Sequence, residues 1–298
     1  MANIFNMIER LCPDGVEYVD FKNVCYITKG VQFNKKNMNE TGSFPVINGG
    51  IKPSGYIEQY NQEKETITVS QGGASAGYVN FIDSKFWAGA HCYIIKPKEL
   101  VLNRYLYHFL KSKECKLQEC QYGAGIPALA KSTVENLKIP APPIEVQCEI
   151  VRILDIFTEC IKLLEKELEL RKKQYQYYRD KLLTFGDDIE YKTIKEVADI
   201  KAGKSINASQ ISSIQDKNHM IKCYGGNGLR GYVKEYNHSG EYPIIGRQGA
   251  LCGNINYAVG DIYATEHAII VNSKAELSQR FLYYLLITRN LKQYNSKG

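Results

Sequence analysis

The sequence lacks the features of membrane and secreted proteins. It has no run of about eighteen consecutive apolar residues, which a membrane-spanning helix needs. Met1 to Arg10 has no uninterrupted apolar stretch of the kind found in a signal peptide. The nine cysteines are scattered and form no Cys-x-x-Cys pair. We therefore expect a cytoplasmic protein with buried, reduced thiols, no metal site and no membrane contact.

Motifs of catalysis are also missing. Gly72-Gly73-Ala74-Ser75-Ala76-Gly77 is similar to a phosphate-binding loop, but no Gly-Lys-Ser or Gly-Lys-Thr follows it. There is no His-Glu-x-x-His sequence, and no Asp/Asn-Pro-Pro-aromatic motif of adenine methylation. The one double proline, Pro142-Pro143, has the wrong neighbours for that motif. These absences predict a protein without catalysis of its own.

The charge is modest and the tyrosine content is high. A formal net charge of +6 and a pI of about 8.7 permit nucleic-acid binding without requiring it. The 22 tyrosines would suit a wet binding surface, because each pairs an apolar ring with a hydrogen-bonding tip. An AT-rich coding bias would also raise the tyrosine content, so both explanations stay open.

One long segment, Ile144 to Phe185, contains neither glycine nor proline. Prolines precede it and Gly186 follows it, as expected at the two ends of a helix. Within it, apolar residues alternate steps of four and three, which is typical of a coiled-coil seam, with Arg171 as the one charged member. The other seam residues are Ile150, Leu154, Phe157, Ile161, Leu164, Leu168, Tyr175, Tyr178 and Leu182.

The segments on either side of this helix resemble each other. A shift of 176 residues places Gly73-Ala74 on Gly249-Ala250 and His91 on His267, and upstream a shift of 173 places Gly30 on Gly203. Paired glycines at fixed offsets indicate turns with positive φ that both copies need. Each copy is predicted to form short strands and helices. In the first copy we expect a strand with a short helical turn at 16–24, further strands at 44–47, 66–70, 77–82, 92–96 and 134–140, and a helix at 102–117.

The fold class we predict is α+β, with two duplicated mixed α/β domains joined by a long coiled-coil helix. The expected division is a first domain at 1–143, a spacer helix at 144–186 and a second domain at 187–298. The second copy ends where the first has its Tyr122–Gly125 turn, so we expect it to be C-terminally truncated.

The loops between the paired glycines differ in their side chains. Ile51-Lys52-Pro53-Ser54 becomes Asn227-Gly228-Leu229-Arg230, which favours two related sites with different targets. Lys and Arg suit phosphates or guanine, and Asn and Gln suit adenine, although an ordinary solvated loop would also carry them. His91 and His267 are either half-buried structural residues or DNA contacts. The candidate DNA-binding residues are Lys29, Gln32, Lys35, Lys36, Lys52, Tyr56, Gln71, Ser75, His91, Lys201, Lys204, Asn227, Arg230, Tyr232, Arg247, Gln248 and His267.

Three segments resemble a known family. They are Cys12–Tyr18, Ile139–Gln147 at the helix entry, and Glu149–Asp155. The chain resembles the specificity (S) subunit of type I restriction–modification systems. This resemblance implies two target-recognition domains that each read half of a split site on double-stranded DNA. It also implies antiparallel helices that set the spacer between the half-sites.

The resemblance implies partners as well. The S subunit docks two modification (methyltransferase) subunits, and restriction subunits join the full complex. No cofactor is expected in this chain; S-adenosylmethionine, ATP and Mg are expected on the partner subunits.

The sequence departs from the family because a second conserved helical region is missing, which leaves the seam without an intrachain partner. We expect either a homodimer through the long helix or a separate fragment that supplies the second helix. The functional alternatives are a truncated specificity fragment, a silent regulatory variant that sequesters modification subunits, and a self-contained DNA methyltransferase or nuclease.

Overall fold

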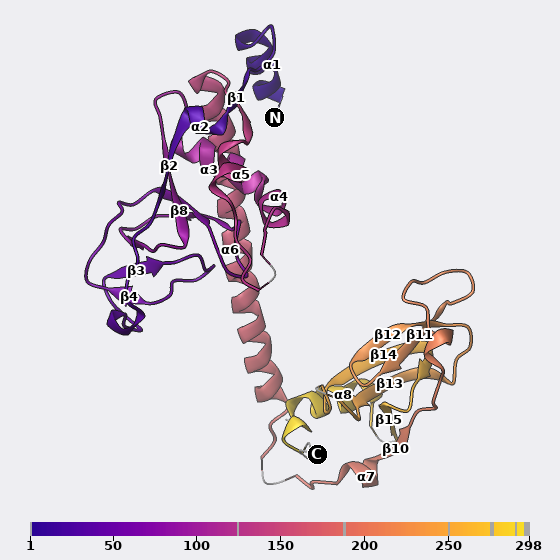
Figure 1. Ribbon diagram of the computed structural model, residues 1–298. Coiled ribbons are helices and arrows are strands. Elements are labelled where there is room, and N and C mark those ends of the chain that lie inside the picture. The colour runs from indigo at the N-terminus through magenta and orange to yellow at the C-terminus, as the bar shows by residue number, and fades with distance from the viewer. Residues whose placement is uncertain are drawn as a thin grey trace. The chain divides into compact units, whose positions relative to one another are not determined.

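The computed structural model describes residues 2–123, 125–186, 189–249, 251–274, 277–289 and 291–294. The chain divides into two compact units, Met1–Leu164 (unit 1) and Glu165–Gly298 (unit 2). The boundary between the units lies within the helix α6 (Ile144–Leu182), which is labelled in Figure 1. Each unit contains a sheet and helices, so the predicted α+β class is confirmed. None of the helices in the described ranges is both long and apolar enough to cross a bilayer.

Unit 1 is built on short strands, most of them antiparallel. Its four-stranded sheet has the order β2 (Cys25–Lys29), β8 (Cys92–Pro97), β5 (Thr66–Ser70), β6 (Val79–Ile82). A three-stranded sheet has the order β4 (Tyr56–Ile57), β3 (Phe44–Ile47), β7 (Trp87–Ala88), and β1 (Tyr18–Asp20) pairs with β9 (Lys138–Pro140). Its other helices are α1 (Ala2–Leu11), α2 (Phe21–Val24), η1 (Lys35–Asn37), α3 (Asn103–Ser112), α4 (Glu114–Glu119) and α5 (Lys131–Glu135).

The core of unit 1 lies between the four-stranded sheet and α3. Leu106 and Leu110 project from α3 and are fully buried together with Ile67 of β5. Val134 of α5 and Ile139 of β9 are buried in the same cluster. Residues far apart in sequence therefore close this core, and the last of them directly precede α6.

Two polar side chains of α6 attach the helix to unit 1. Gln147 is fully buried; its Oε1 accepts from the backbone N of Leu102 at 2.9 Å, and its Nε2 donates to the carbonyl oxygens of Leu100 and Pro142. Two turns later, Asp155 Oδ1 lies 2.7 Å from both Arg104 Nε and His108 Nε2, which belong to α3. The first three turns of α6 are thus held by directional contacts as well as by packing.

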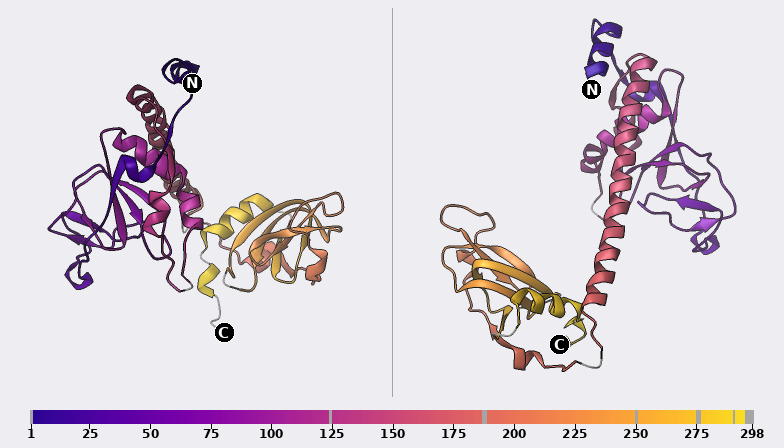
Figure 2. Two further views of the ribbon diagram at one scale, coloured as in Figure 1. Left: turned by 45° about the horizontal axis from the view of Figure 1, so that its top comes forward. Right: turned by 180° about the vertical axis from the view of Figure 1, so that it is seen from behind.

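Unit 2 carries one six-stranded sheet. The order is β10 (Ala198–Ala202), β15 (Ala268–Ser273), β13 (His238–Gly246), β14 (Ile255–Ala264), β11 (Ile221–Gly225), β12 (Gly228–Val233), and only β11 and β14 pair in parallel. α8 (Gln279–Thr288) packs across β13, β14 and β15 on one face (Figure 2). The remaining elements are α7 (Ile194–Val197), η2 (Ala208–Gln210) and η3 (Leu291–Tyr294).

The structure confirms the predicted duplication. α3 and α8 have matching bounds at the shift of 176 residues, as do β8 and β15, and α2 and α7 match at the shift of 173. Gly73 and Gly249 have φ values of 84° and 87°, so this pair of turns requires glycine in both copies. The expectation of positive φ is wrong for Gly30 and Gly203; a Cβ on them would instead lie 2.1 Å from the carbonyl oxygens of Gly89 and Ala264, respectively. It is also wrong for Gly225, because only its counterpart Gly49 has a positive φ, at 82°.

Several predicted elements need correction. The expected strand at 134–140 instead contains the end of helix α5 and the three-residue strand β9, because Val134 turns inward and β1 offers only three residues for pairing. The expected strand at 16–24 is limited to β1 at 18–20, and its expected short helical turn is α2. The expected helix at 102–117 divides at Lys113, which leaves helical geometry at φ −100° and ψ 0°. Strands β3 and β5 have the predicted bounds, and α6 ends at Leu182, three residues before the predicted end.

The cysteines only partly match the expectation of buried thiols. Cys25, Cys92 and Cys223 are buried, and burial raises the pKa of the Cys25 and Cys92 thiols to about 12. The expectation of burial is wrong for four cysteines, which lie on or directly after helices and face solvent. These are Cys115, Cys120, Cys148 and Cys160.

A groove in unit 2 marks a difference between the two copies. In unit 1, α5 and β9 cover the side chains of α2 and α3. The described residues of unit 2 contain no counterpart of α5 and β9. The matching side chains, among them Ile194, Phe281 and Leu285, instead line a groove of about 700 Å³ that also includes Leu183 and Phe185 after the end of α6.

Candidate functional site

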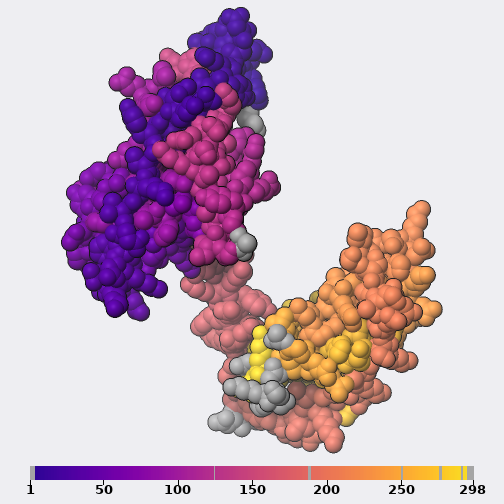
Figure 3. Space-filling model, in the orientation of Figure 1, coloured from indigo at the N-terminus to yellow at the C-terminus, as the bar shows by residue number. Residues whose placement is uncertain are grey.

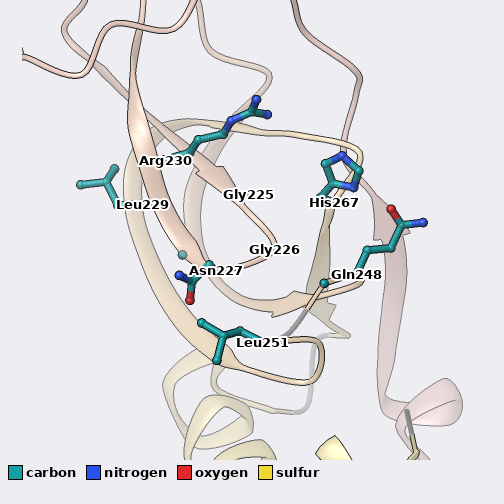
Figure 4. Close-up of a pocket in the computed structure, with 10 residues that line it drawn as sticks. Gly225, Gly226, Asn227, Leu229, Arg230, Gln248, Leu251 and His267 are labelled. Atoms are coloured by element: carbon teal, nitrogen blue, oxygen red, sulfur yellow. The ribbon is translucent and has the colours of Figure 1, made fainter. Parts of the chain in front are cut away.

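The best-defined hollow among the predicted binding residues lies in unit 2. It has a volume of about 670 Å³ and is formed by three segments: the β11–β12 hairpin, the loop after β13 and the turn before β15. Figure 4 shows the side chains set around one ring of backbone, with the Arg230 guanidinium extending toward the side on which His267 lies. The lining residues are Gly225, Gly226, Asn227, Gly228, Leu229, Arg230, Gln248, Gly249, Leu251 and His267.

Glycines make the tight hairpin possible. Gly228 has φ 90°, and a Cβ there would lie 2.8 Å from Asn256 Oδ1. A Cβ on Gly226 would lie 2.9 Å from the carbonyl oxygen of Gln248. The hairpin and the loop after β13 therefore approach each other more closely than they could if residue 226 carried a side chain. As a result, the side chains of Asn227 and Gln248 line the same hollow.

The spacing Gly226-x-Gly228-x-x-Gly231 after strand β11 was missed by sequence reasoning, although it matches a dinucleotide-binding fingerprint. That fingerprint works by placing a pyrophosphate at the N-terminus of a following helix. Here the glycines lead into strand β12, so no helix N-terminus faces the hollow from this turn. The structural context therefore argues against a dinucleotide.

Backbone hydrogen bonds, rather than imidazole rings, hold the two matching histidines in place. The carbonyl oxygen of His267 accepts from Arg247 N at 2.9 Å, and that of His91 accepts from Gln71 N at 2.8 Å. The His91 ring is exposed, and the His267 ring is partly exposed with Glu266 Oε1 at 3.4 Å. A half-buried structural role is thus wrong for the His91 ring. Both rings are accessible to a ligand.

The electrostatic character of the hollow comes from Arg230. Its side chain is exposed, and its charge acts on the nearby thiol of Cys223, whose pKa is nevertheless raised because burial has the larger effect. Leu229 and Leu251 add exposed apolar surface, with residue exposures of 51 % and 38 %. Sequence reasoning missed both leucines, and only their position inside the glycine-framed loops could have indicated them.

The corresponding loops of unit 1 share the scaffold but not the chemistry. A Cβ on Gly49 would lie 2.8 Å from the carbonyl oxygen of His91 and 3.2 Å from that of Gly72, so these loops are also in close contact. Lys52 is exposed in the first loop, while Gln71 and Ser75 are partly exposed in the second. The same backbone framework thus presents a different set of polar groups in each unit.

None of the lysines of the predicted basic loops is among the residues that line this hollow. In unit 1, Lys29 ends β2, and Gln32, Lys35 and Lys36 are all exposed near η1. In unit 2, Lys201 and Lys204 are exposed. Burial lowers the pKa of His238, and the charges of these two lysines lower it further. In both units these lysines are therefore accessible to solvent.

The structure places all seventeen predicted binding residues at the surface or partly exposed. It brings four of them, Asn227, Arg230, Gln248 and His267, into one hollow. Arg247 is exposed beside the hollow but does not line it, and Tyr56 and Tyr232 are partly exposed on β4 and β12. Across the described ranges, no three His, Cys, Asp or Glu residues are grouped so that they could hold a metal ion.

Comparison with known proteins follows the same division of the chain. The model of the type I restriction modification DNA specificity domain matches residues 13–171 and 186–298. A specificity subunit of a type I restriction enzyme from Escherichia coli is 45 % identical over 166 residues, covering 53 % of this chain and 41 % of that protein. A putative type I restriction enzyme specificity subunit from Haemophilus influenzae is 32 % identical, covering 95 % of this chain and 80 % of that protein.

The fold is shared with a solved structure. The crystal structure of the S subunit of a type I restriction–modification system from M. genitalium superposes with a TM-score of 0.70 at 23 % identity, covering 94 % of this chain and 78 % of that one. This chain therefore spans less than half of the E. coli relative but about four fifths of the H. influenzae and M. genitalium proteins.

Proposed function

Because this chain belongs to the type I restriction modification DNA specificity family, we propose that it is the sequence-reading subunit of a type I restriction–modification complex, without catalysis of its own. The observation that carries the proposal is the duplicated scaffold with divergent loops. The hydrogen bond from Gln71 N to His91 O recurs as that from Arg247 N to His267 O, while the surrounding side chains differ. Such a chain is suited to reading two different half-sites of double-stranded DNA.

The hollow of unit 2 supplies groups that can read bases. A guanidinium such as that of Arg230 can donate twice to guanine, and the amides of Asn227 and Gln248 can pair with adenine. Leu229 and Leu251 offer apolar contact of the kind that a thymine methyl group makes. The exposed lysines of the predicted basic loops would contact phosphates and orient the protein on the duplex.

The partners we propose follow from the family and from α6. They are two modification subunits that bring S-adenosylmethionine, restriction subunits that bring ATP and Mg, and a second helix against the seam. A truncated fragment or a silent variant that sequesters modification subunits is the second candidate, favoured by the seam's exposure from Leu154 to Leu182. The division into 1–143, 144–186 and 187–298 stays a prediction, as does the cytoplasmic location.

A methylation assay tests the proposal and separates it from the second candidate. Cognate modification subunits are incubated with DNA, with and without this chain, and methylated adenines are mapped. Methylation at one bipartite sequence, only when the chain is present, is the expected result. A chain that binds the modification subunits yet lowers methylation would instead be a sequestering variant.

Replacing Arg230 by Ala should relax recognition at one base position, at a cost of roughly 1–3 kcal/mol for the preferred base. The cause is loss of a base-directed guanidinium from the hollow. Lys201→Ala is the matched control, because loss of a phosphate contact weakens all sequences equally. Binding to a set of single-base variants of the target measures both effects. A uniform loss for Arg230→Ala would show that this side chain contacts phosphate.

A further inference from the structure

One loop of unit 2 is longer than its counterpart in unit 1. In each unit the chain pairs twice with one tyrosine of an edge strand, which is Tyr56 of β4 in unit 1 and Tyr232 of β12 in unit 2. The segment between the two pairings is 40–44 in unit 1 and 213–221 in unit 2. The additional residues of unit 2 form a loop at 213–220, which we call the extended loop.

Hydrogen bonds within the extended loop hold it in a defined conformation. Asp216 Oδ1 accepts from the backbone N of Asn218 at 2.7 Å and from that of His219 at 2.8 Å. Gln215 Nε2 donates to the carbonyl oxygen of Met220 at 3.4 Å. A loop that is ordered before binding loses less conformational entropy when it meets a partner.

The extended loop presents large apolar side chains to solvent. Ile214 is 73 % exposed, the highest value for a large apolar residue in the described part of unit 2, and Met220 is 58 % exposed. Phe44, the counterpart of Met220 in unit 1, is only partly exposed, and its ring packs against that of Tyr60 at 5.0 Å between centroids. The exposed apolar loop is therefore a property of the second copy.

The segment that contains this loop is strongly positive. It runs from residue 204 to residue 234 and holds one acidic residue, Asp216, whose carboxylate is engaged inside the loop. Lysine is depleted at the centres of protein–protein interfaces, whereas DNA phosphates attract it. The charge therefore favours DNA over a protein as the partner. The five cations of the segment, all exposed, are Lys204, Lys217, Lys222, Arg230 and Lys234.

The extended loop begins beside the hollow of unit 2. Ser212 N donates to Tyr232 O at 2.9 Å, and Tyr232 N donates to Ser212 O at 2.8 Å, so the start of the loop is fixed to β12. Leu229 and Arg230 of the same strand line the hollow. The exposed side chains of this segment belong to the surface of unit 2, whose atoms include the salmon and orange ones in Figure 3. DNA bound at the hollow would thus lie next to the extended loop.

We propose that the extended loop is a wedge, which inserts Ile214 between two base pairs of the DNA at unit 2 and kinks the duplex. Apolar side chains that enter a base step in this way kink DNA by about 20–90°. The surrounding lysines would hold the phosphates on either side of the step. A pyrimidine–purine step is expected, because such steps unstack most easily. Since Phe44 packs within unit 1, we expect no matching kink in the other half-site.

Kink and unstacking are measured on the full chain with its modification subunits, bound to duplexes that carry the bipartite target. Energy transfer between dyes at the two DNA ends should report a kink of about 20–90°. 2-Aminopurine, placed at one position at a time, should become fluorescent at one step in the half-site of unit 2. Ile214→Ala should lose both signals and weaken binding about tenfold, because an apolar contact is lost. Ile214→Leu should keep both signals.

Ile200→Ala is the matched control. Ile200 is 50 % exposed on β10, which forms the edge of the same sheet opposite to β12. This variant removes the same side chain from a comparably exposed position outside the extended loop. It should leave the kink, the fluorescence and the affinity unchanged.

A straight duplex with the unchanged chain, or a kink that persists in Ile214→Ala, would overturn the inference. Loss of binding to the modification subunits in Ile214→Ala, with the kink retained, would show that the loop docks a protein and would also overturn it. The inference rests on the proposed function, but the two fail separately. Methylation at one bipartite sequence of an unkinked duplex rejects only the wedge, whereas the absence of sequence-directed methylation rejects the proposed function.

Discussion

Replacing Leu164 by Glu will abolish pairing through α6, with a loss of more than about 100-fold in affinity. Leu164 is a seam residue with 63 % of its side chain exposed in the single chain. A carboxylate there would be buried against the apolar side chains of the proposed partner helix, and burial of an unpaired charge is costly. Each substitution also removes about 1.5–3 kcal/mol of apolar burial.

Leu163→Glu is the matched control for this experiment. Leu163 is the adjacent residue, it has 57 % exposure, and it does not belong to the seam. Size-exclusion chromatography with light scattering should show pairing kept in Leu163→Glu and lost in Leu164→Glu. The reverse result would place the pairing on the face of α6 that carries Leu163, and loss in neither variant would mean that α6 does not mediate association.

Replacing Gln147 by Ala will destabilise unit 1 by about 3–5 kcal/mol. The side chain is fully buried, and its loss leaves the backbone groups of Leu100, Leu102 and Pro142 without the partners they have now. Water cannot replace the amide without opening the contact between α3 and α6. We therefore expect the start of α6 to detach before the rest of the core unfolds.

The single tryptophan makes this measurement specific to unit 1. Trp87 belongs to β7, and its Nε1 donates to the carbonyl oxygen of Val31 at 2.9 Å. Urea unfolding followed by Trp87 fluorescence thus reports on unit 1 and not on unit 2. Glu145→Ala, two residues away and exposed, is the control and should change stability by less than about 0.5 kcal/mol. Equal effects for both variants would show that the buried amide has no special role.

The buried contacts of Gln147 also explain a sequence signature. Ile144-Glu145-Val146-Gln147 served to identify the family resemblance, and in the structure Val146 and Gln147 are both fully buried. Val146 packs into the unit, and Gln147 satisfies three backbone groups that no secondary structure pairs. The signature therefore reflects how the helix is attached to its domain.

Local sequence patterns were sufficient for α6, β3, β5 and the duplication. A segment of about forty residues without glycine or proline and with a sustained heptad can form little besides a long helix. Glycines recurring at one offset indicate turns that side chains would block, as the φ values of Gly73 and Gly249 show. Each of these features depends on interactions within a few residues or on a comparison of the chain with itself.

Local patterns were not sufficient where packing between residues far apart in the sequence determines the secondary structure. The segment 131–140 has the β-branched and apolar content of a strand. It nevertheless forms α5 and β9, because its partners α2 and β1 lie more than a hundred residues earlier. Sequence reasoning also missed a second exposed apolar stripe of α6, since apolar residues at every seventh position stand out only when the helix surface is known to be exposed. Its residues are Ile156, Leu163, Leu170 and Tyr177.

The sequence by itself determined the α+β class, the repeated scaffold, the long helix and the family, because these follow from periodicity, glycine spacing and local motifs. Only the tertiary structure decided which candidate residues share a site. Asn227, Gln248 and His267 come from three loops that are distant in sequence, and the sheet brings them to one hollow with Arg230. The placement of these loops side by side depends on the order and register of strands β11, β13 and β15, which no local pattern encodes.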